Sequence, residues 1–175
     1  LKDSALRTSV NLSFDKIRSI ISDYGPFDLT IGLGSCEDDF KALPKSYSQA
    51  MNSIKARVVA GANRIIDISE KAYTNSELSE LFPLEEEMKL ERFLEVLDSK
   101  SAYSLVSDIF RIFNERSNIN PSIVFDMAFK IIEIFYRVLR RMDIDIESAY
   151  IRKTRVYSEI EECNSVKQIQ DSLYK

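Results

Sequence analysis

The segment from Asn120 to Met142 constrains the fold of this chain more than any other feature. Its polar residues recur at alternating spacings of four and three, so on a helix they form one narrow stripe. Apolar side chains cover the rest of the circumference, and such a helix must be surrounded on nearly all sides. The second half of the chain is therefore predicted to be a helical bundle. The stripe consists of Asp126, Lys130, Glu133, Arg137 and Arg140.

Capping signals place the helices of the second half. Asn120 and Pro121 suit the N-cap and first position of the central helix, which is predicted over 121–142 and is roughly 33 Å long. Two opposite-charge pairs in the stripe have i,i+4 spacing and are predicted to pair along this helix. These pairs are Asp126 with Lys130 and Glu133 with Arg137. A capping box at Thr74 and Glu77 predicts a short helix. Further helices are predicted from Pro83 to about Asp98, starting at Ser99 or Ser101, over 147–162 and over 165–174.

The first half mixes helix and strand signals. Ser13 is predicted to cap a helix that ends at Gly25-Pro26, and residues 27–33 and 64–68 are strand-like. Between the strands, Ser46 and Gln49 have capping-box spacing. The helix that they open has a predicted apolar face, and Gly61 suits its C-cap. The face comprises Tyr47, Ala50, Met51, Ile54 and Val58. The boundary between the halves is predicted within 69–76.

Composition excludes several kinds of chemistry. The 175-residue chain has no histidine, which rules out imidazole-based catalysis and His-ligated metals. Its net charge of −4 gives no overall attraction to nucleic acid or anionic lipid. Two distant cysteines, Cys36 and Cys163, favour a reducing compartment, and no segment has the length and apolarity of a membrane span. We expect a cytoplasmic protein that makes no membrane contact through this segment.

The remaining local motifs have ordinary structural interpretations. Gly32-Leu-Gly34 is too short for a dinucleotide fingerprint, and it predicts close backbone approach or a tight strand exit. The acidic run 37–39 is interpreted as a solvated loop, and the run 85–87 as a first helical turn favoured by the helix dipole. No catalytic, cofactor-binding or metal-binding residue is assigned.

A family resemblance rests on three stretches of the first half. Leu29-Thr-Ile-Gly-Leu-Gly34, Leu43-Pro-Lys-Ser-Tyr-Ser-Gln-Ala50 and Gly61-Ala-Asn-Arg-Ile-Ile66 resemble the strand, helix and strand of the C-terminal part of GGDEF domains. They are most similar to the degenerate GGDEF-like middle region of AraC-type bacterial transcription regulators. That group includes response regulators of the YesN kind and membrane-anchored relatives, with LPxSYxQA at the start of the helix.

The resemblance implies a mostly α chain with a small α+β N-terminal part. Residues 1–72 would be a partial, degenerate GGDEF-like unit, and residues 73–175 a helical bundle that leads to a DNA-binding domain absent from this sequence. The GGDEF turn and the metal-binding aspartate of active cyclases have no counterpart here, so no enzyme activity and no cofactor are expected. The implied function is signal transmission, with the chain's own receiver or sensor domain, its helix-turn-helix domain and a homodimeric copy as partners. DNA would be bound only through the missing domain.

Two other functions are considered. A small-molecule effector pocket could form among aromatic residues of the second half, although their helical spacing also fits an ordinary core. These residues are Tyr103, Phe110, Phe113, Phe125, Phe129, Phe135 and Tyr136. A nucleic-acid patch could form if the last two long helices turn back on each other, although basic residues near a helix C-terminus are also explained by the dipole. Its members would be Arg137, Arg140, Arg141, Arg152, Lys153 and Arg155.

Overall fold

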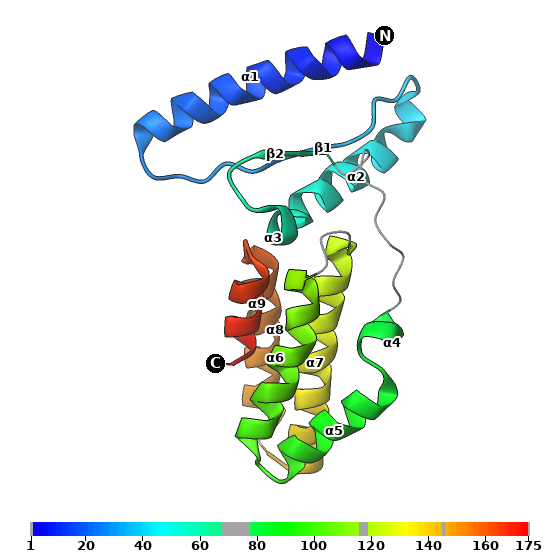
Figure 1. The fold of residues 1–175 in the computed structure, drawn as a ribbon, viewed down its shortest axis with the longest axis vertical. Coiled ribbons are helices and arrows are strands. Elements are labelled where there is room, and N and C mark those ends of the chain that lie inside the picture. Colours follow the sequence, from blue (N-terminus) through cyan, green and yellow to red (C-terminus); the bar gives the residue numbers. More distant parts are fainter. Residues whose placement is uncertain (1, 68–77, 116–118, 145, 175) are drawn as a thin grey trace. The chain divides into compact units, whose positions relative to one another are not determined.

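A computed structural model of the chain describes residues 2–67, 78–115, 119–144 and 146–174 (Figure 1). The chain is mostly helical, with a small parallel sheet of two strands. It forms two compact units, Leu1–Ala72 and Tyr73–Lys175. The expected mixture of a small α+β part and a helical part is present. The predicted boundary segment, 69–76, lies outside the described residues.

The first unit is built around a strand–helix–strand arrangement. Helix α1 (Lys2–Tyr24) precedes strand β1 (Ile31–Leu33), a short 3-10 helix η1 (Phe40–Ala42), helix α2 (Leu43–Lys55), the single turn α3 (Arg57–Ala60) and strand β2 (Ile65–Asp67). The strands are parallel, with Ile31 opposite Ile65 and Leu33 opposite Asp67. Helix α2 packs against β1, as Figure 1 shows.

Two predictions at the start of this unit are wrong. Ser13 lies inside α1, where its hydroxyl donates a hydrogen bond to the Ser9 carbonyl, because the helical segment extends well before the predicted cap. The first strand is limited to Ile31–Leu33, whereas residues 27–33 were predicted. Phe27 is 61% exposed, and its amide donates to the Gly25 carbonyl in a tight turn, so this residue does not pair with β2.

The predicted start and apolar face of α2 also need correction. The helix begins at Leu43 with a proline in its first turn, so Ser46 is not the N-cap. Of the predicted buried face, Val58 is buried, but Tyr47 is 68% exposed and Met51 is 40% exposed. The face that contacts the sheet includes Ala50, Ser53 and Ile54, and the backbone of α2 lies close to β1 at its glycines. Gly61 is the C-cap residue of α3, as predicted, but its φ of 88° and ψ of 151° lie outside the left-handed helical region expected for such a cap.

The second unit is a bundle around the predicted central helix. Helices α4 (Leu78–Leu81), α5 (Leu84–Glu95), α6 (Ser99–Glu115), α7 (Pro121–Arg141), α8 (Ile146–Glu162) and α9 (Val166–Leu173) form it. Helix α7 packs against α4, α5, α8 and α9, and it supplies several side chains with no exposed surface. The prediction of a helix surrounded on most sides is confirmed. The fully enclosed residues of α7 include Val124, Met127, Ala128 and Ile134.

The capping predictions of this unit had mixed outcomes. Asn120 caps α7 by accepting a hydrogen bond from the Ser122 amide, as predicted. Pro83 precedes α5 as its N-cap residue, and that helix ends at Glu95, short of the predicted end. Helix α6 starts at Ser99 because the Asp98 carboxylate caps it by accepting from the Ser101 amide. The capping box at Thr74 and Glu77 lies outside the described residues.

Candidate functional site

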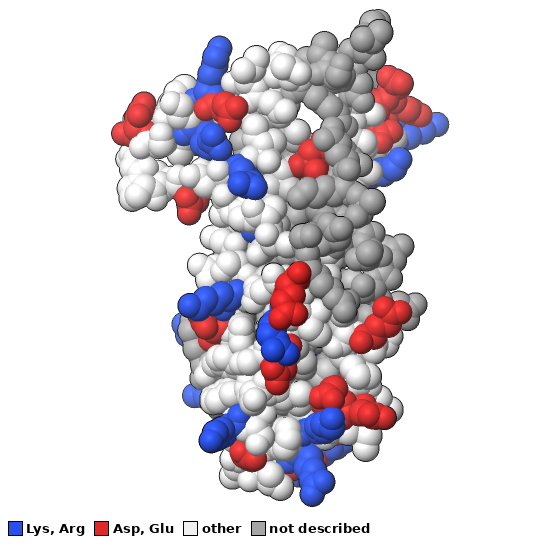
Figure 2. Space-filling view, in the orientation of Figure 1, with Lys and Arg blue, Asp and Glu red and all other residues white. Residues whose placement is uncertain are grey.

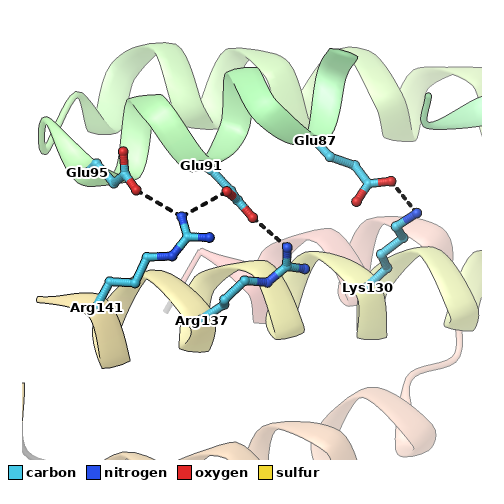
Figure 3. Close-up of polar contacts among 6 residues, drawn as sticks. All are labelled: Glu87, Glu91, Glu95, Lys130, Arg137 and Arg141. Carbon is cyan, nitrogen blue, oxygen red and sulfur yellow. Dashed lines mark hydrogen bonds and ion pairs between the residues drawn. The ribbon is translucent and has the colours of Figure 1, made fainter. Parts of the chain in front are cut away.

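An ion-pair ladder joins α5 to the central helix α7 (Figure 3). Helix α5 presents three glutamates at four-residue intervals, which places them along one side of that helix. They face three basic side chains of α7, which come from the predicted polar stripe and from the residue after its end. We call this set the α5–α7 ladder. Its members are Glu87, Glu91 and Glu95 from α5 and Lys130, Arg137 and Arg141 from α7.

Glu91 is the centre of the ladder. One of its carboxylate oxygens accepts a hydrogen bond from Arg137 Nη1 at 2.6 Å, and the other accepts from Arg141 Nη1 at 3.1 Å. Arg141 Nη1 also lies 3.1 Å from Glu95 Oε1, and Lys130 pairs with Glu87. The pairs advance along both helices together, so α5 and α7 run in the same direction. This set of contacts therefore defines the register in which α7 lies on α5 in this structure.

The carboxylates of the ladder are more enclosed than the cations. The side chains of Glu87 and Glu91 are 14% and 16% exposed, whereas that of Arg141 is 53% exposed. A carboxylate with this little access to water loses hydrogen bonds to water, and it is stable in the folded protein only if charged donors replace them. Hydrogen bonds to Glu95 and Glu91 raise the pKa of Arg141 above its ordinary value. Lys130 also lies over the Phe82 ring, with its ammonium nitrogen 5.7 Å from the ring centroid.

A second polar cluster joins α7 to α8. Glu133 Oε1 accepts hydrogen bonds from Lys153 Nζ and from the Tyr157 hydroxyl, both at 2.6 Å. These bonds, that of Lys153 first, lower the pKa of Glu133. Burial, followed by the bond to Glu133, raises the pKa of Tyr157. The Lys153 ammonium lies 5.8 Å from the Tyr136 ring centroid and 5.7 Å from that of Tyr157. The Phe129 and Tyr157 rings are 4.7 Å apart.

The last helix, α9, is attached to α6 through Tyr174. The Tyr174 hydroxyl lies 2.7 Å from Ser107 Oγ and donates to the Tyr103 carbonyl at 3.2 Å. Gln170 Nε2 donates to the same hydroxyl at 2.7 Å, and the Tyr103 and Tyr174 rings meet edge to face at 4.8 Å. Polar contacts therefore join α5 to α7, α7 to α8 and α6 to α9.

In the first unit, two glycines allow α2 to approach the sheet at backbone distance. A Cβ on Gly32 would lie 2.2 Å from the Ala50 carbonyl oxygen, and one on Gly34 would lie 2.1 Å from that of Ser46. The prediction of close backbone approach is confirmed. Ser53 Oγ, fully buried, donates to the Leu33 carbonyl at 2.8 Å.

The predicted capping-box pair has a different role at this joint. Ser46 Oγ donates to the Ser35 carbonyl at 2.7 Å, and Gln49 Oε1 accepts from the Ser35 amide at 2.9 Å. Both side chains therefore bind the chain just after β1. They close the strand–helix joint and do not cap the helix.

The polar stripe of α7 was predicted correctly in position and incompletely in its partners. Lys130 and Arg137 pair with glutamates of α5, and Glu133 pairs with Lys153 of α8. The prediction had instead paired the residues of the stripe with one another along α7. Glu91 and Glu95 were not singled out. The signal that could have revealed them is the four-residue spacing of glutamates on α5, which matches the spacing of Arg137 and Arg141 on α7.

The predicted basic patch is largely matched with acidic side chains. Arg137 and Arg141 bind the ladder glutamates, Lys153 binds Glu133, and Arg155 Nε lies 2.9 Å from Glu159. Basic and acidic side chains are interspersed over the visible face of this unit in Figure 2. This arrangement does not favour the nucleic-acid interpretation.

The aromatic residues proposed to line a pocket belong to separate groups. Phe110 and Phe113 form an edge-to-face pair inside the core, and Phe125 packs beside Phe129. Tyr103 contacts Tyr174, while Phe135 is 42% exposed and contacts Tyr136. The ring contacts therefore do not bring these residues together around one pocket. The core interpretation holds for Phe110, Phe113 and Phe125, which are buried, and is wrong for Tyr103 and Phe135, which are exposed.

The remaining candidate residues have structural partners. In the acidic run 37–39, Asp38 and Asp39 are exposed as predicted, and Asp39 caps η1. Glu37 is only 18% exposed and accepts a hydrogen bond from Ser35 Oγ at 2.5 Å. In the second acidic run, Glu85 is exposed but Glu87 belongs to the ladder. The described parts of the chain contain no cluster of His, Cys, Asp or Glu suited to a metal ion. Among the described helices, none is long and apolar enough to cross a membrane.

No protein-family model matches the chain, and neither a curated protein nor a solved structure does.

Proposed function

We propose that the chain is a non-catalytic, signal-transmitting middle region of a bacterial AraC-type transcription regulator that works in the cytoplasm. In this proposal, residues 1–72 are a degenerate GGDEF-like unit and residues 73–175 are a helical coupling region. The partners are the protein's own receiver or sensor domain, its helix-turn-helix domain and a second copy of the chain. The sequence resemblance supports the lineage, and the α5–α7 ladder is the observation that supports transmission.

The spacing of the ladder permits two discrete registers of α7 on α5. The glutamates of α5 repeat every four residues, or about 6 Å along the helix, and so do Arg137 and Arg141. When α7 moves by one turn toward the start of α5, Arg137 meets Glu87 in place of Glu91. Arg141 keeps Glu91, and Glu95 loses its partner. Intermediate positions pair none of these groups well, so the equilibrium has two states that a signal can bias.

The test uses the full-length protein that contains this chain, with transcription from its target promoter as the readout. Glu95→Gln and Lys130→Gln each remove a pair that only the described register makes. Both variants are expected to shift transcription in the same direction. Glu91→Gln removes a carboxylate that is paired in either register, so it is expected to lower stability with a smaller shift in output. Glu85→Gln is the matched control, since Glu85 is exposed on the same helix.

Two outcomes contradict separate parts of the proposal. A full-length protein without a DNA-binding domain after Lys175 contradicts the assignment to transcription regulators. Folded Glu95→Gln and Lys130→Gln variants with unchanged or opposite transcription contradict the two-register mechanism.

A further inference from the structure

The longer helices of the second unit fall into two groups. Helix α5 packs against α6, and a turn of three residues, 96–98, joins the two helices. Helix α7 packs against α8 and α9, which also pack against each other, and Glu133 binds Lys153 and Tyr157 between α7 and α8. We call these groups the α5–α6 pair and the α7–α9 group. The contacts of α5 with α7 and of α6 with α9 connect them.

The contact between α6 and α9 contains a compact polar network. The Tyr174 hydroxyl lies 2.7 Å from Ser107 Oγ and donates to the Tyr103 carbonyl at 3.2 Å. Gln170 Nε2 donates to the Tyr174 hydroxyl at 2.7 Å and to Ser107 Oγ at 3.0 Å. The Tyr174 ring also meets the Tyr103 ring edge to face. We call these four residues the Tyr174 clamp. It joins the α7–α9 group to the α5–α6 pair, as the α5–α7 ladder does.

A change of register on the ladder also moves α9 along α6. Helices α5 and α6 pack together across a short turn and run in opposite directions, whereas α5 and α7 run in the same direction. When the α7–α9 group slides by one turn toward the start of α5, it therefore slides toward the end of α6. The Tyr174 hydroxyl then moves about 6 Å, from Ser107 to the level of Arg111. Its hydrogen bonds to Ser107 and to the Tyr103 carbonyl are lost.

We infer that the Tyr174 clamp is a second lock on the register of the ladder, and that it favours the described register. The ladder holds Glu91 paired in either register, whereas the bonds of the clamp to α6 form in the described register. Release of Tyr174 therefore shifts the ladder without touching any of its charges. This inference deepens the proposed function and rests on its two-register mechanism. In the proposed regulator, the chain continues from α9 toward the DNA-binding domain, so the clamp ties the ladder to that domain.

The register can be measured in the 175-residue chain as the distance between two spin labels, by pulsed electron paramagnetic resonance. Lys100, near the start of α6, and Glu162, at the end of α8, are exposed and belong to different groups. Figure 1 shows these helix ends at opposite ends of the unit. A slide of the α7–α9 group toward the end of α6 moves the labels apart by up to about 6 Å. The labels are attached at Lys100→Cys and Glu162→Cys, with the exposed Cys36 replaced by serine and the buried Cys163 kept.

The variants are tested in two steps. Glu95→Gln combined with Lys130→Gln removes two pairs of the described register, so a second, longer distance is expected. Adding Tyr174→Phe removes the hydroxyl of the clamp and keeps the ring beside Tyr103. It should raise the ratio of the longer to the shorter distance about fivefold. Ser107→Ala, at an exposed position, removes the hydroxyl on the other side of the clamp and should change the ratio in the same direction.

Tyr157→Phe is the matched control. Tyr157 also donates a hydrogen bond from its hydroxyl, to Glu133 at 2.6 Å, but both residues belong to the α7–α9 group. This bond moves with the group and does not depend on the register. The substitution should therefore lower the stability of the unit and leave the ratio of the two distances unchanged.

Each result identifies which idea fails. A single, unchanged distance in the Glu95→Gln, Lys130→Gln chain overturns the two-register mechanism and the inference with it. A second distance whose share does not grow when Tyr174→Phe or Ser107→Ala is added overturns the clamp as a lock and leaves the mechanism standing. An equal growth with Tyr157→Phe also overturns the clamp, because general loosening of the unit then explains the change. The assignment to transcription regulators depends on none of these distances.

Discussion

Replacing Glu91 by glutamine tests how much the α5–α7 ladder stabilises the helical unit. The substitution preserves the size of the side chain and removes its charge. Glu91 is 16% exposed and binds Arg137 at 2.6 Å and Arg141 at 3.1 Å, whereas both arginines are about half exposed. Each partly screened pair is worth about 0.5–1 kcal/mol, so the expected loss of unfolding free energy is about 1–2 kcal/mol.

The assay is urea denaturation followed by far-ultraviolet circular dichroism. Glu95→Gln provides an internal comparison, because Glu95 is 44% exposed and binds Arg141 alone. Its expected cost is about half a kcal/mol or less. Glu85→Gln, on an exposed position of the same helix, should cost nothing measurable. Because the arginines are accessible to water, the effect of Glu91→Gln should shrink in about 1 M salt.

The reasoning has a clear point of failure. A Glu91→Gln variant that is as stable as Glu85→Gln would mean that desolvation of the carboxylate cancels its attraction to both arginines. A loss that does not change with salt would mean that packing, and not charge, is responsible. Either result would refute the ladder as a source of electrostatic stability.

Three further outcomes are expected. Gly34→Ala should disrupt the first unit, because the added Cβ would lie 2.1 Å from the Ser46 carbonyl oxygen; amide NMR spectra would detect the loss of folded signals. Asn120→Ala should lower the unfolding free energy by about 1 kcal/mol through loss of the α7 cap, measured by denaturation. The pKa of Glu133 is lowered in the folded protein, so its ionised form stabilises the fold above about pH 4.5, and this stabilisation is lost as the pH falls through the pKa of the folded state. Glu133→Gln should remove this part of the decrease in unfolding free energy at low pH, measured by denaturation at several pH values.

Features encoded within one helix could be predicted from the sequence. The cap at Asn120 and the proline after it act on the first turn of α7 alone, so their pattern is sufficient. The polar stripe could be placed for the same reason, since helical periodicity decides which residues share a side. The small sheet could be predicted from two short β-branched segments, although within the described residues three residues of each strand are paired.

The predictions at the start of α2 were wrong because its polar side chains can bind either a neighbouring backbone group or one far away in the sequence. Ser46 and Gln49 have the spacing of a capping box, yet both bind Ser35, which lies 11 and 14 residues earlier in the chain. The close approach at Gly34 brings Ser35 within reach of α2, and it also directs Tyr47 away from the sheet. One tertiary contact therefore displaced the predicted cap and exposed part of the predicted apolar face.

The polar stripe of α7 illustrates why a periodic pattern underdetermines function. A narrow polar stripe on an otherwise apolar helix can face either solvent or a charged neighbour, and the pattern of that helix alone is the same in both cases. The distinction depends on α5, where Glu87 and Glu91 are enclosed although the fragment LEEEMKLERFLE looks like an ordinary exposed surface. A stripe that faces a charged helix is distinguished from one that faces solvent by a matching four-residue spacing of opposite charges on a second helix. Glu91 and Glu95 of α5 match Arg137 and Arg141 of α7 in this way, and the proposed two-register mechanism depends on that contact.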